Sequence, residues 1–244
     1  MAKRSIQDVT TAGAAAEGED PSRTLIEHAY VRLRDDIIEG WLPPDERLRV
    51  EHLKVRYGVG AGTLREAITW LVSDALVVGE GQRGFRVAPA TLADLEDLTR
   101  LRLHIELDAL RQSIRRGNDA WRAHLQDVYT QLSAVEQPLR PKDRRRWEQL
   151  NTRFHEALIA ACDSPWTMKV LRTLSRHSER YRSIAIGSLQ GCRDVHAEHR
   201  LIFEMAMSGQ EARAALALEA HIRATPDALA RSEWTLREVA CPQA

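Results

Sequence analysis

The segment NTRFHEAL places an asparagine and a histidine four positions apart in a stretch with helical spacing. Asn151 and His155 would then project from one face of a helix, one turn apart, as two ligands of a metal ion do. Imidazole suits a transition metal, whereas a neutral amide oxygen is a weaker ligand than a carboxylate. The spacing leaves three interpretations open: half of a metal site, a degraded metal site, or ordinary helix packing.

The composition indicates a globular protein without an overall electrostatic preference. The chain has 244 residues, 43% hydrophobic and 29% charged, and its 35 basic and 35 acidic residues cancel. Contacts with DNA would therefore come from a local group of arginines. The three scattered cysteines, Cys162, Cys192 and Cys241, fit neither a disulfide framework nor a CxxC site. Without a membrane-spanning apolar run or a signal-like start, we expect a cytoplasmic protein with no membrane partner.

Residues 23–90 have the order of elements of a winged helix-turn-helix. After a small, polar tail at 1–22, which we expect to be disordered, Thr24 and Glu27 form a capping box for a helix that ends at Gly40. Two short helices and two strands follow, at residues 50–57, 62–73, 77–78 and 85–87. The helices are separated by the turn GVGAG and the strands by the loop GEGQRG, which predicts a helix-turn-helix followed by a wing.

From Thr91 onward the sequence predicts only helices, so that the fold is mainly α. Thr91 begins a long amphipathic helix that ends near Gly117. Further helices are predicted at residues 119–136, 143–162, 166–187, 190–208 and 210–231. Residues 91–231 therefore form an all-α antiparallel helical bundle, followed by a tail at 232–244.

The two parts together resemble one family of bacterial transcription regulators. The proline-led turn before Leu48, the run at 53–59, LREA at 64–67 and the glycine-tipped wing are similar to the winged helix of the GntR family. The bundle is similar to the FCD (FadR-type) subfamily, so the resemblance covers residues 24–230. Within that subfamily, VGAGTLREA, QRGFRVAP and RGNDAW resemble the carbon-starvation-induced branch, which responds to glutarate.

The resemblance implies that the second short helix enters the major groove with its N-terminal residues toward the base edges. Arg65 is the candidate for a bidentate contact to guanine or for a phosphate contact. Family members commonly have arginine where this chain has Ala61, and Ser or Thr at Gly60, which leaves the operator sequence open. Other candidates for DNA contacts are Thr63, Gly62, Arg49, Arg56, Gln82 and Arg83, with Arg47 and Lys54 as further basic residues.

In FCD domains, an Asp-x-x-x-His pair and one histidine from each of two later helices bind a metal. The corresponding residues here are Asn151, His155, His199 and His221, so an asparagine stands where the family has aspartate. The resemblance thus implies Zn, Ni, Fe or Mn as cofactor. A three-histidine site, a weaker four-ligand site and a metal-free pocket remain open, with His196 as a substitute ligand.

The resemblance also implies an effector pocket beside the metal. Arg102 corresponds to the arginine that meets the effector carboxylate in the family, and Glu106, one turn later, would hold it in an i,i+4 pair. Asn151 and Tyr181 complete the predicted pocket, with Arg182 as a further candidate. An arginine beside a metal favours a small mono- or dicarboxylic acid such as glutarate.

These features predict a ligand-responsive transcription regulator, usually a repressor in this family, and not an enzyme. A homodimer would place two winged helices on a pseudo-palindromic operator in double-stranded DNA, and the effector would change their separation. One alternative is a helical-bundle metalloenzyme acting on a carboxylic acid, which lacks a nucleophile with a partnered base. The other is an architectural DNA binder, which does not explain the histidines and lacks a surplus of basic residues.

Overall fold

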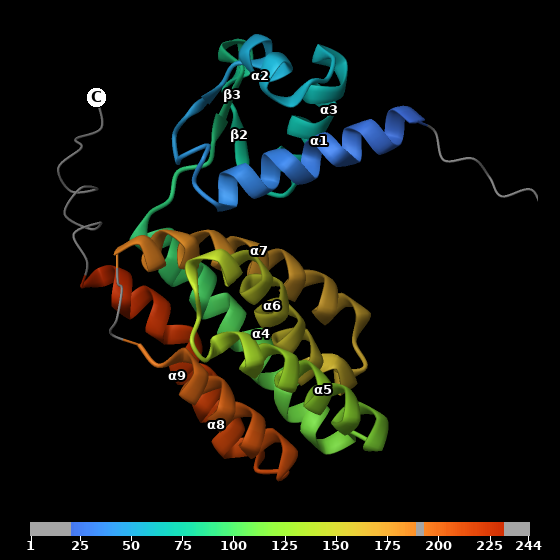
Figure 1. Ribbon diagram of the computed structural model, residues 1–244, viewed down its shortest axis with the longest axis vertical. Helices are drawn as coiled ribbons and strands as arrows, with labels where there is room; N and C mark the ends of the chain where they lie inside the picture. The colour runs from blue at the N-terminus through green and yellow to red at the C-terminus, as the bar shows by residue number, and fades with distance from the viewer. Residues whose placement is uncertain (1–20, 189–192, 232–244) are drawn as a thin grey trace, which may run out of the picture.

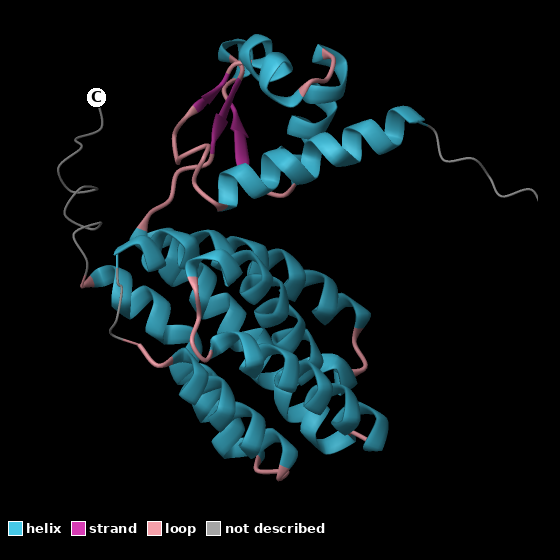
Figure 2. Ribbon diagram, in the orientation of Figure 1, coloured by secondary structure: helices cyan, strands magenta, loops and turns pink. Residues whose placement is uncertain are grey.

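The computed structural model describes residues 21–188 and 193–231, which form a small winged helix stacked on a larger helical bundle (Figure 1). Within the described residues, strands occur only in the winged helix, and the mainly α fold is confirmed (Figure 2). The tails predicted at 1–22 and 232–244 lie outside the described residues, apart from Pro21 and Ser22, which belong to the first helix. No helix of the described residues is long and apolar enough to cross a membrane.

The first helix begins earlier than the sequence predicted. Helix α1 spans Pro21–Ile38, so Thr24 and Glu27 lie inside the helix, and the predicted capping box does not mark its start. Proline is favoured in the first turn of a helix because the N–H that it lacks would have no intrahelical partner there. The chain turns after the helix at Gly40, whose φ of 83° suits a residue without a side chain.

The helix-turn-helix and the wing follow in the predicted order. Their elements are α2 (Val50–Tyr57), α3 (Ala61–Ser73), β1 (Arg47–Leu48), β2 (Val77–Gly79) and β3 (Phe85–Val87). The predicted hairpin pairs β2 with β3, and the additional strand β1 pairs with the other side of β3. Fully buried Leu33, Leu64 and Leu71 join α1 and α3 in the core of this part.

The bundle consists of helices whose starts are fixed by capping side chains and breaks. They are α4 (Leu92–Arg116), α5 (Asp119–Glu136), α6 (Arg144–Ile159), α7 (Pro165–Ser188), α8 (Val195–Met207) and α9 (Glu211–Ala230). Thr91, Asn118 and Asp194 each accept a hydrogen bond from a backbone N–H in the first turn of α4, α5 and α8. The helix predicted at 143–162 ends at Ile159 and continues as a 3₁₀ turn to Cys162.

The two parts meet along α7, which lies on the side of the bundle that faces α1 (Figure 1). Arg180, only 3% exposed, donates to the backbone carbonyls of Ala88 and Pro89 in the linker between β3 and α4. One turn earlier, His177 Nε2 donates to the carbonyl of Asp74 at the end of α3, at 2.8 Å. A single helix of the bundle therefore holds both the linker and the helix-turn-helix.

Candidate metal centre and nucleic-acid interface

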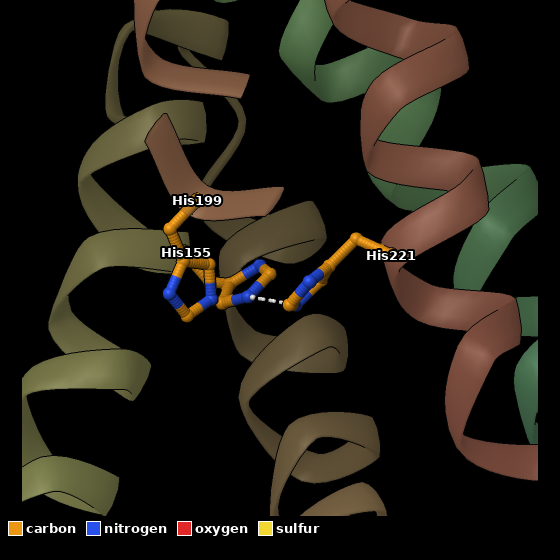
Figure 3. A group of neighbouring side chains, drawn as sticks. All are labelled: His155, His199 and His221. Carbon is orange, nitrogen blue, oxygen red and sulfur yellow. Dashed lines mark hydrogen bonds between the residues drawn. The ribbon is translucent and has the colours of Figure 1, made fainter. Parts of the chain in front are cut away.

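Three histidines from three helices converge inside the bundle (Figure 3). His155 comes from α6, His199 from α8 and His221 from α9, and all three are buried. One ring nitrogen from each lies within 4.8 Å of those of the other two, and Nε2 of His155 is 3.3 Å from Nε2 of His221. The helices thus gather the three histidines that the sequence predicted.

A carboxylate contacts the outer nitrogen, Nδ1, of every one of these rings. The carboxylates come from α4, α5 and α8, so each histidine is held by a neighbouring helix. The pairs are His155 with Glu106 at 2.9 Å, His199 with Glu136 at 2.6 Å, and His221 with Glu198 at 2.8 Å. A carboxylate behind the second nitrogen is the usual partner of a metal-binding histidine, because it fixes the ring and raises its basicity.

These carboxylates determine which nitrogen carries the proton. A carboxylate only accepts hydrogen bonds, so Nδ1 of each ring must donate, and a neutral ring then has its lone pair on Nε2. The Nε2 lone pairs of His155 and His221 therefore face each other across 3.3 Å, and Nε2 of His199 is buried without a hydrogen-bond partner among the described residues. Three inward lone pairs form a site that a cation could occupy, either a proton or a metal ion.

Burial disfavours the proton. It lowers the pKa of His155 to about 4, against the opposing effect of Glu106, and it lowers the pKa of His221 well below the ordinary value. Burial alone would raise the pKa of Glu106, but Arg102 and His155 bring it down to about 2. At neutral pH, His155 and His221 are thus neutral imidazoles and Glu106 is an anionic carboxylate, which are the protonation states that metal binding requires.

Asn151 is buried on the same helix as His155, whereas the predicted substitute ligand His196 does not join the group. Asn151 is 2% exposed and precedes His155 by one turn of α6, so both occupy the same helix face. Its amide makes no hydrogen bond to another described residue. His196 instead faces Glu136, with Nδ1 at 3.2 Å from the carboxylate, and lies outside the converging group.

Arg102 is buried next to the histidines, and the predicted pair with Glu106 is present. Its Nε donates to Glu106 at 2.6 Å, and its Nη2 lies 3.4 Å from Nδ1 of His155. In the described part of the chain, Nη1 of Arg102 has no hydrogen-bond partner. This guanidinium therefore keeps a donor available for an anion beside the histidines.

The adjacent residues Tyr181 and Arg182 point in different directions from α7. Tyr181 donates to Asp94 at 2.6 Å and packs with Leu95 in a small core at the linker, so the structure does not bring this predicted effector residue to the histidines. Arg182 faces the bundle interior, where Nη2 donates to Glu148 at 2.9 Å and the buried Nε has no partner in the described residues. Burial lowers the pKa of Arg182, but Glu148 and other nearby carboxylates, Glu106 among them, raise it overall.

The predicted DNA-contacting residues lie on the outer side of the helix-turn-helix and the wing. Arg65 and Gly62 are exposed on α3, Thr63 is half-buried, and no side chain caps the N-terminus of this helix. The first backbone N–H groups of α3 and its Arg65 are thus presented on one exposed surface, as an anion or a base edge would require.

The other basic candidates differ in their ion pairing. Arg56 pairs with Asp36 at 2.9 Å and Lys54 with Glu51, so both take part in contacts within the winged helix. Arg49, Gln82 and Arg83 are exposed, and neither arginine has an ion pair among residues 21–188 and 193–231. Arg49, Arg65 and Arg83 are consequently the guanidinium groups of this surface that are ready to meet phosphates.

Comparisons with known proteins agree with this division into two parts. Residues 25–87 match the family model described as bacterial regulatory proteins, gntR family, and residues 97–224 match that of the FCD domain. A relative from Paraburkholderia xenovorans (strain LB400), the uncharacterized HTH-type transcriptional regulator BphR, is 41% identical and aligns over 83% of this chain and 84% of its own. The HTH-type transcriptional repressor GlaR of Escherichia coli (strain K12) is 32% identical over 79% of this chain and 90% of its own.

Solved structures show the same fold. The E. coli protein McbR/YncC aligns with a TM-score of 0.70 over 85% of this chain and 97% of its own, at 18% identity. A putative transcriptional regulator GntR from Rhodococcus sp. RHA1 aligns with a TM-score of 0.67 over 85% and 99%, at 20% identity.

Proposed function

The chain belongs to the GntR family of bacterial regulatory proteins and carries an FCD domain, and from this premise we propose that it is a repressor controlled by a metal-dependent carboxylate effector. Its family and relatives make it a transcription regulator and not an enzyme. The 32% identical E. coli relative is named a repressor, which supports repression rather than activation of transcription. The effector is a small mono- or dicarboxylic acid such as glutarate.

The main support for a bound metal ion is that the Nε2 lone pairs of the three histidines face one another inside the bundle. Glutamates take the outer nitrogens of His155, His199 and His221, and burial keeps His155 and His221 unprotonated at neutral pH. The three histidines would hold Zn, Ni, Fe or Mn, with Asn151 as a fourth, weaker ligand. A metal bound there would supply a localised positive charge with positions open to a carboxylate oxygen.

Arg102 and Arg182 are the candidates for the rest of the effector pocket. Arg102 is buried and Arg182 is half-buried, and each has a guanidinium nitrogen that makes no hydrogen bond to a described residue. Guanidinium groups bind carboxylates with two parallel hydrogen bonds, which favours a second carboxylate on the effector. This supports a dicarboxylic acid over a neutral ligand.

The winged helix would bind DNA through α3, which would enter the major groove, and through the wing tip, which would lie along the sugar-phosphate backbone of the DNA. Arg65 would read a base, while Arg49, Arg83 and the N–H groups of Gly62 and Thr63 would contact phosphates. Only a few of these residues can reach base edges, so one winged helix provides little specificity. A homodimer on a pseudo-palindromic operator doubles these contacts.

Helix α7 connects the effector pocket to the DNA-binding surface. Arg182 of α7 faces the pocket, whereas Arg180 and His177 of the same helix hold the linker and the end of α3. A ligand that moves or fixes α7 would therefore change the position of the winged helix. A coupling free energy of about 1–3 kcal/mol would change operator affinity roughly 5- to 150-fold.

The test uses DNA selected from a random double-stranded library by the full-length protein. We expect a two-fold symmetric motif, whose fluorescence anisotropy titration shifts when zinc and glutarate are added together. A chelator should abolish the shift without abolishing DNA binding. A motif without symmetry, or an affinity that no mono- or dicarboxylate changes in either condition, would contradict the proposal.

A further inference from the structure

The outer face of α4 borders a groove that is lined by apolar and charged side chains. The groove has a volume of about 570 Å³ and lies between α4 and α9. Its apolar lining comes from Leu101, Leu103 and Leu107 of α4, and Leu101 is 47% exposed. On the neighbouring α9, Leu216 is 66% exposed. An apolar strip rimmed by charges is typical of a surface that binds another protein.

The charged residues of the same face are arranged symmetrically about His104. Asp97 and Arg111 lie seven positions before and after it, and Arg100 and Asp108 lie four positions before and after it. Each pair thus has an acidic residue on one side of His104 and a basic residue on the other. At 100° per residue, all four lie within about 40° of the direction of His104, and all five side chains are exposed.

Such a face is complementary to a second copy of itself. In an antiparallel pair of α4 helices with the two-fold axis beside His104, residues equally far from His104 lie at the same level. Asp97 of one protomer then faces Arg111 of the partner subunit, and the two-fold axis repeats this contact. Leu101, three positions before His104, lies at the level of the partner's Leu107, three positions after it. A parallel pair would instead place identical charges opposite each other.

The single chain leaves these charges available to a partner. Arg111 has no ion pair within the part of the chain that the structure describes. Asp97 pairs with Arg100, but their side chains are 75% and 74% exposed, and an ion pair this exposed contributes little stability. The buried pair of Arg102 and Glu106 projects from the opposite side of α4, so the groove is separate from the histidine centre.

We propose that the protein dimerises through this face of α4, with a second copy packed antiparallel about His104. This inference rests on the homodimer of the proposed function and names the surface that forms it. Helix α4 follows β3 after a linker of four residues, Ala88 to Thr91, so a contact centred on His104 fixes the separation of the two winged helices. The same helix carries Arg102 on its inner face, and a ligand that moves α4 would change that separation.

The experiment reverses one charge in each of two separately purified full-length variants. Arg111→Glu places a like charge opposite the partner's Asp97, and Asp97→Arg places one opposite the partner's Arg111. Each variant alone should have a dimer dissociation constant at least about tenfold above that of the wild type, because like charges repel at a contact. Fluorescence-detected sedimentation velocity over a dilution series measures this constant.

An equimolar mixture of the two variants should dimerise again. In the mixed dimer the two new charges are opposite and face each other, and the native Asp97 and Arg111 face each other as well. The dissociation constant should therefore return to within about threefold of the wild-type value, which a variant that failed to fold could not achieve.

The matched controls reverse the same charges at exposed positions of other helices, with Arg200→Glu on α8 and Asp127→Arg on α5. They should dimerise as the wild type does, alone and mixed. As an independent measurement, His104→Cys should form a disulfide-linked dimer under mild oxidation, because a residue beside the two-fold axis faces its own copy. The exposed His124→Cys of α5 should give no more linked dimer than the wild type.

The possible failures are distinguishable. A wild type that stays monomeric at every concentration would overturn the homodimer of the proposed function together with this interface. A wild-type dimer that neither charge reversal weakens would overturn the interface alone. Reversals that weaken the dimer without recovery on mixing would overturn the antiparallel pairing about His104.

Discussion

Replacement of Glu136 by glutamine should weaken metal binding without disturbing the fold. Glu136 lies at the end of α5 and accepts from Nδ1 of His199 at 2.6 Å and from Nε1 of Trp147 at 2.9 Å. Glutamine has the same shape and can keep both hydrogen bonds through its oxygen, but it removes the negative charge behind the imidazole. Loss of such an outer partner typically costs 10- to 100-fold in metal affinity.

The effect can be measured as a loss of metal-induced stability. If free zinc is buffered at 100 times the wild-type Kd, binding stabilises the folded protein by about 2.7 kcal/mol. The same free zinc is only ten times a tenfold weaker Kd and equal to a hundredfold weaker one, which gives about 1.4 and about 0.4 kcal/mol, respectively. Urea unfolding in a zinc buffer and in chelator gives this difference for each variant.

The control is Glu204→Gln, which removes the same charge from an exposed position of α8, the helix that carries His199. It should retain the full stabilisation by zinc. If Glu136→Gln also retains about 2.7 kcal/mol, the carboxylate does not support His199 as a ligand, and the interpretation of the outer glutamates is refuted.

Four further predictions concern DNA, coupling, pH and assembly. Arg65→Ala should lower the preference for selected over scrambled DNA by about 1–3 kcal/mol in anisotropy titrations, and an equal loss on both DNAs would mean a phosphate contact instead. Arg180→Met removes the hydrogen bonds from α7 to the linker. Calorimetry should still detect binding of zinc and glutarate, whereas the operator affinity should no longer change when they are added. A preserved change in operator affinity would exclude coupling through Arg180. His155 has its pKa lowered from 6.5 to about 4, so the unfolded chain binds more protons between these values, and the chelator-treated protein should lose stability as the pH falls through that window. Equal urea unfolding midpoints at pH 7 and pH 5 would contradict this predicted loss of stability. Light scattering should give a dimer, and specific operator binding by a monomer would rule that out.

The order of elements was predictable from the sequence because its signals are local. Thr91 accepts from the N–H of Asp94, and glycine and proline mark the turns, so most of the predicted helices were found within a few residues of their ends. Strand β1 was missed because two residues are too short to show an alternating pattern, and only its pairing with β3 defines it. The start of α1 was misplaced because Thr24 offers a capping pattern that the helix runs through.

The candidate site was only partly predictable, since its outer residues come from different helices. Glu198 directly precedes His199 in the sequence, yet it supports His221 on α9, and His199 is held by Glu136 from α5. Neighbours in a helix point about 100° apart, so sequence adjacency carries no information about these pairs. Tyr181 and Arg182 illustrate the same limit, because one side chain contacts Asp94 near the linker and the other contacts Glu148 of α6.

The linker between β3 and α4 has a thermodynamic consequence for operator recognition. Its four residues, from Ala88 to Thr91, are held by Arg180 at two carbonyls, by the burial of Ala90, and by a hydrogen bond from the N–H of Thr91 to Tyr181. A free tether would lose about 1–2 kcal/mol of backbone entropy per residue on binding DNA. Here that ordering is completed when the protein folds, so the winged helix reaches the operator already oriented, and inserted residues in this linker should weaken DNA binding even where every DNA contact is retained.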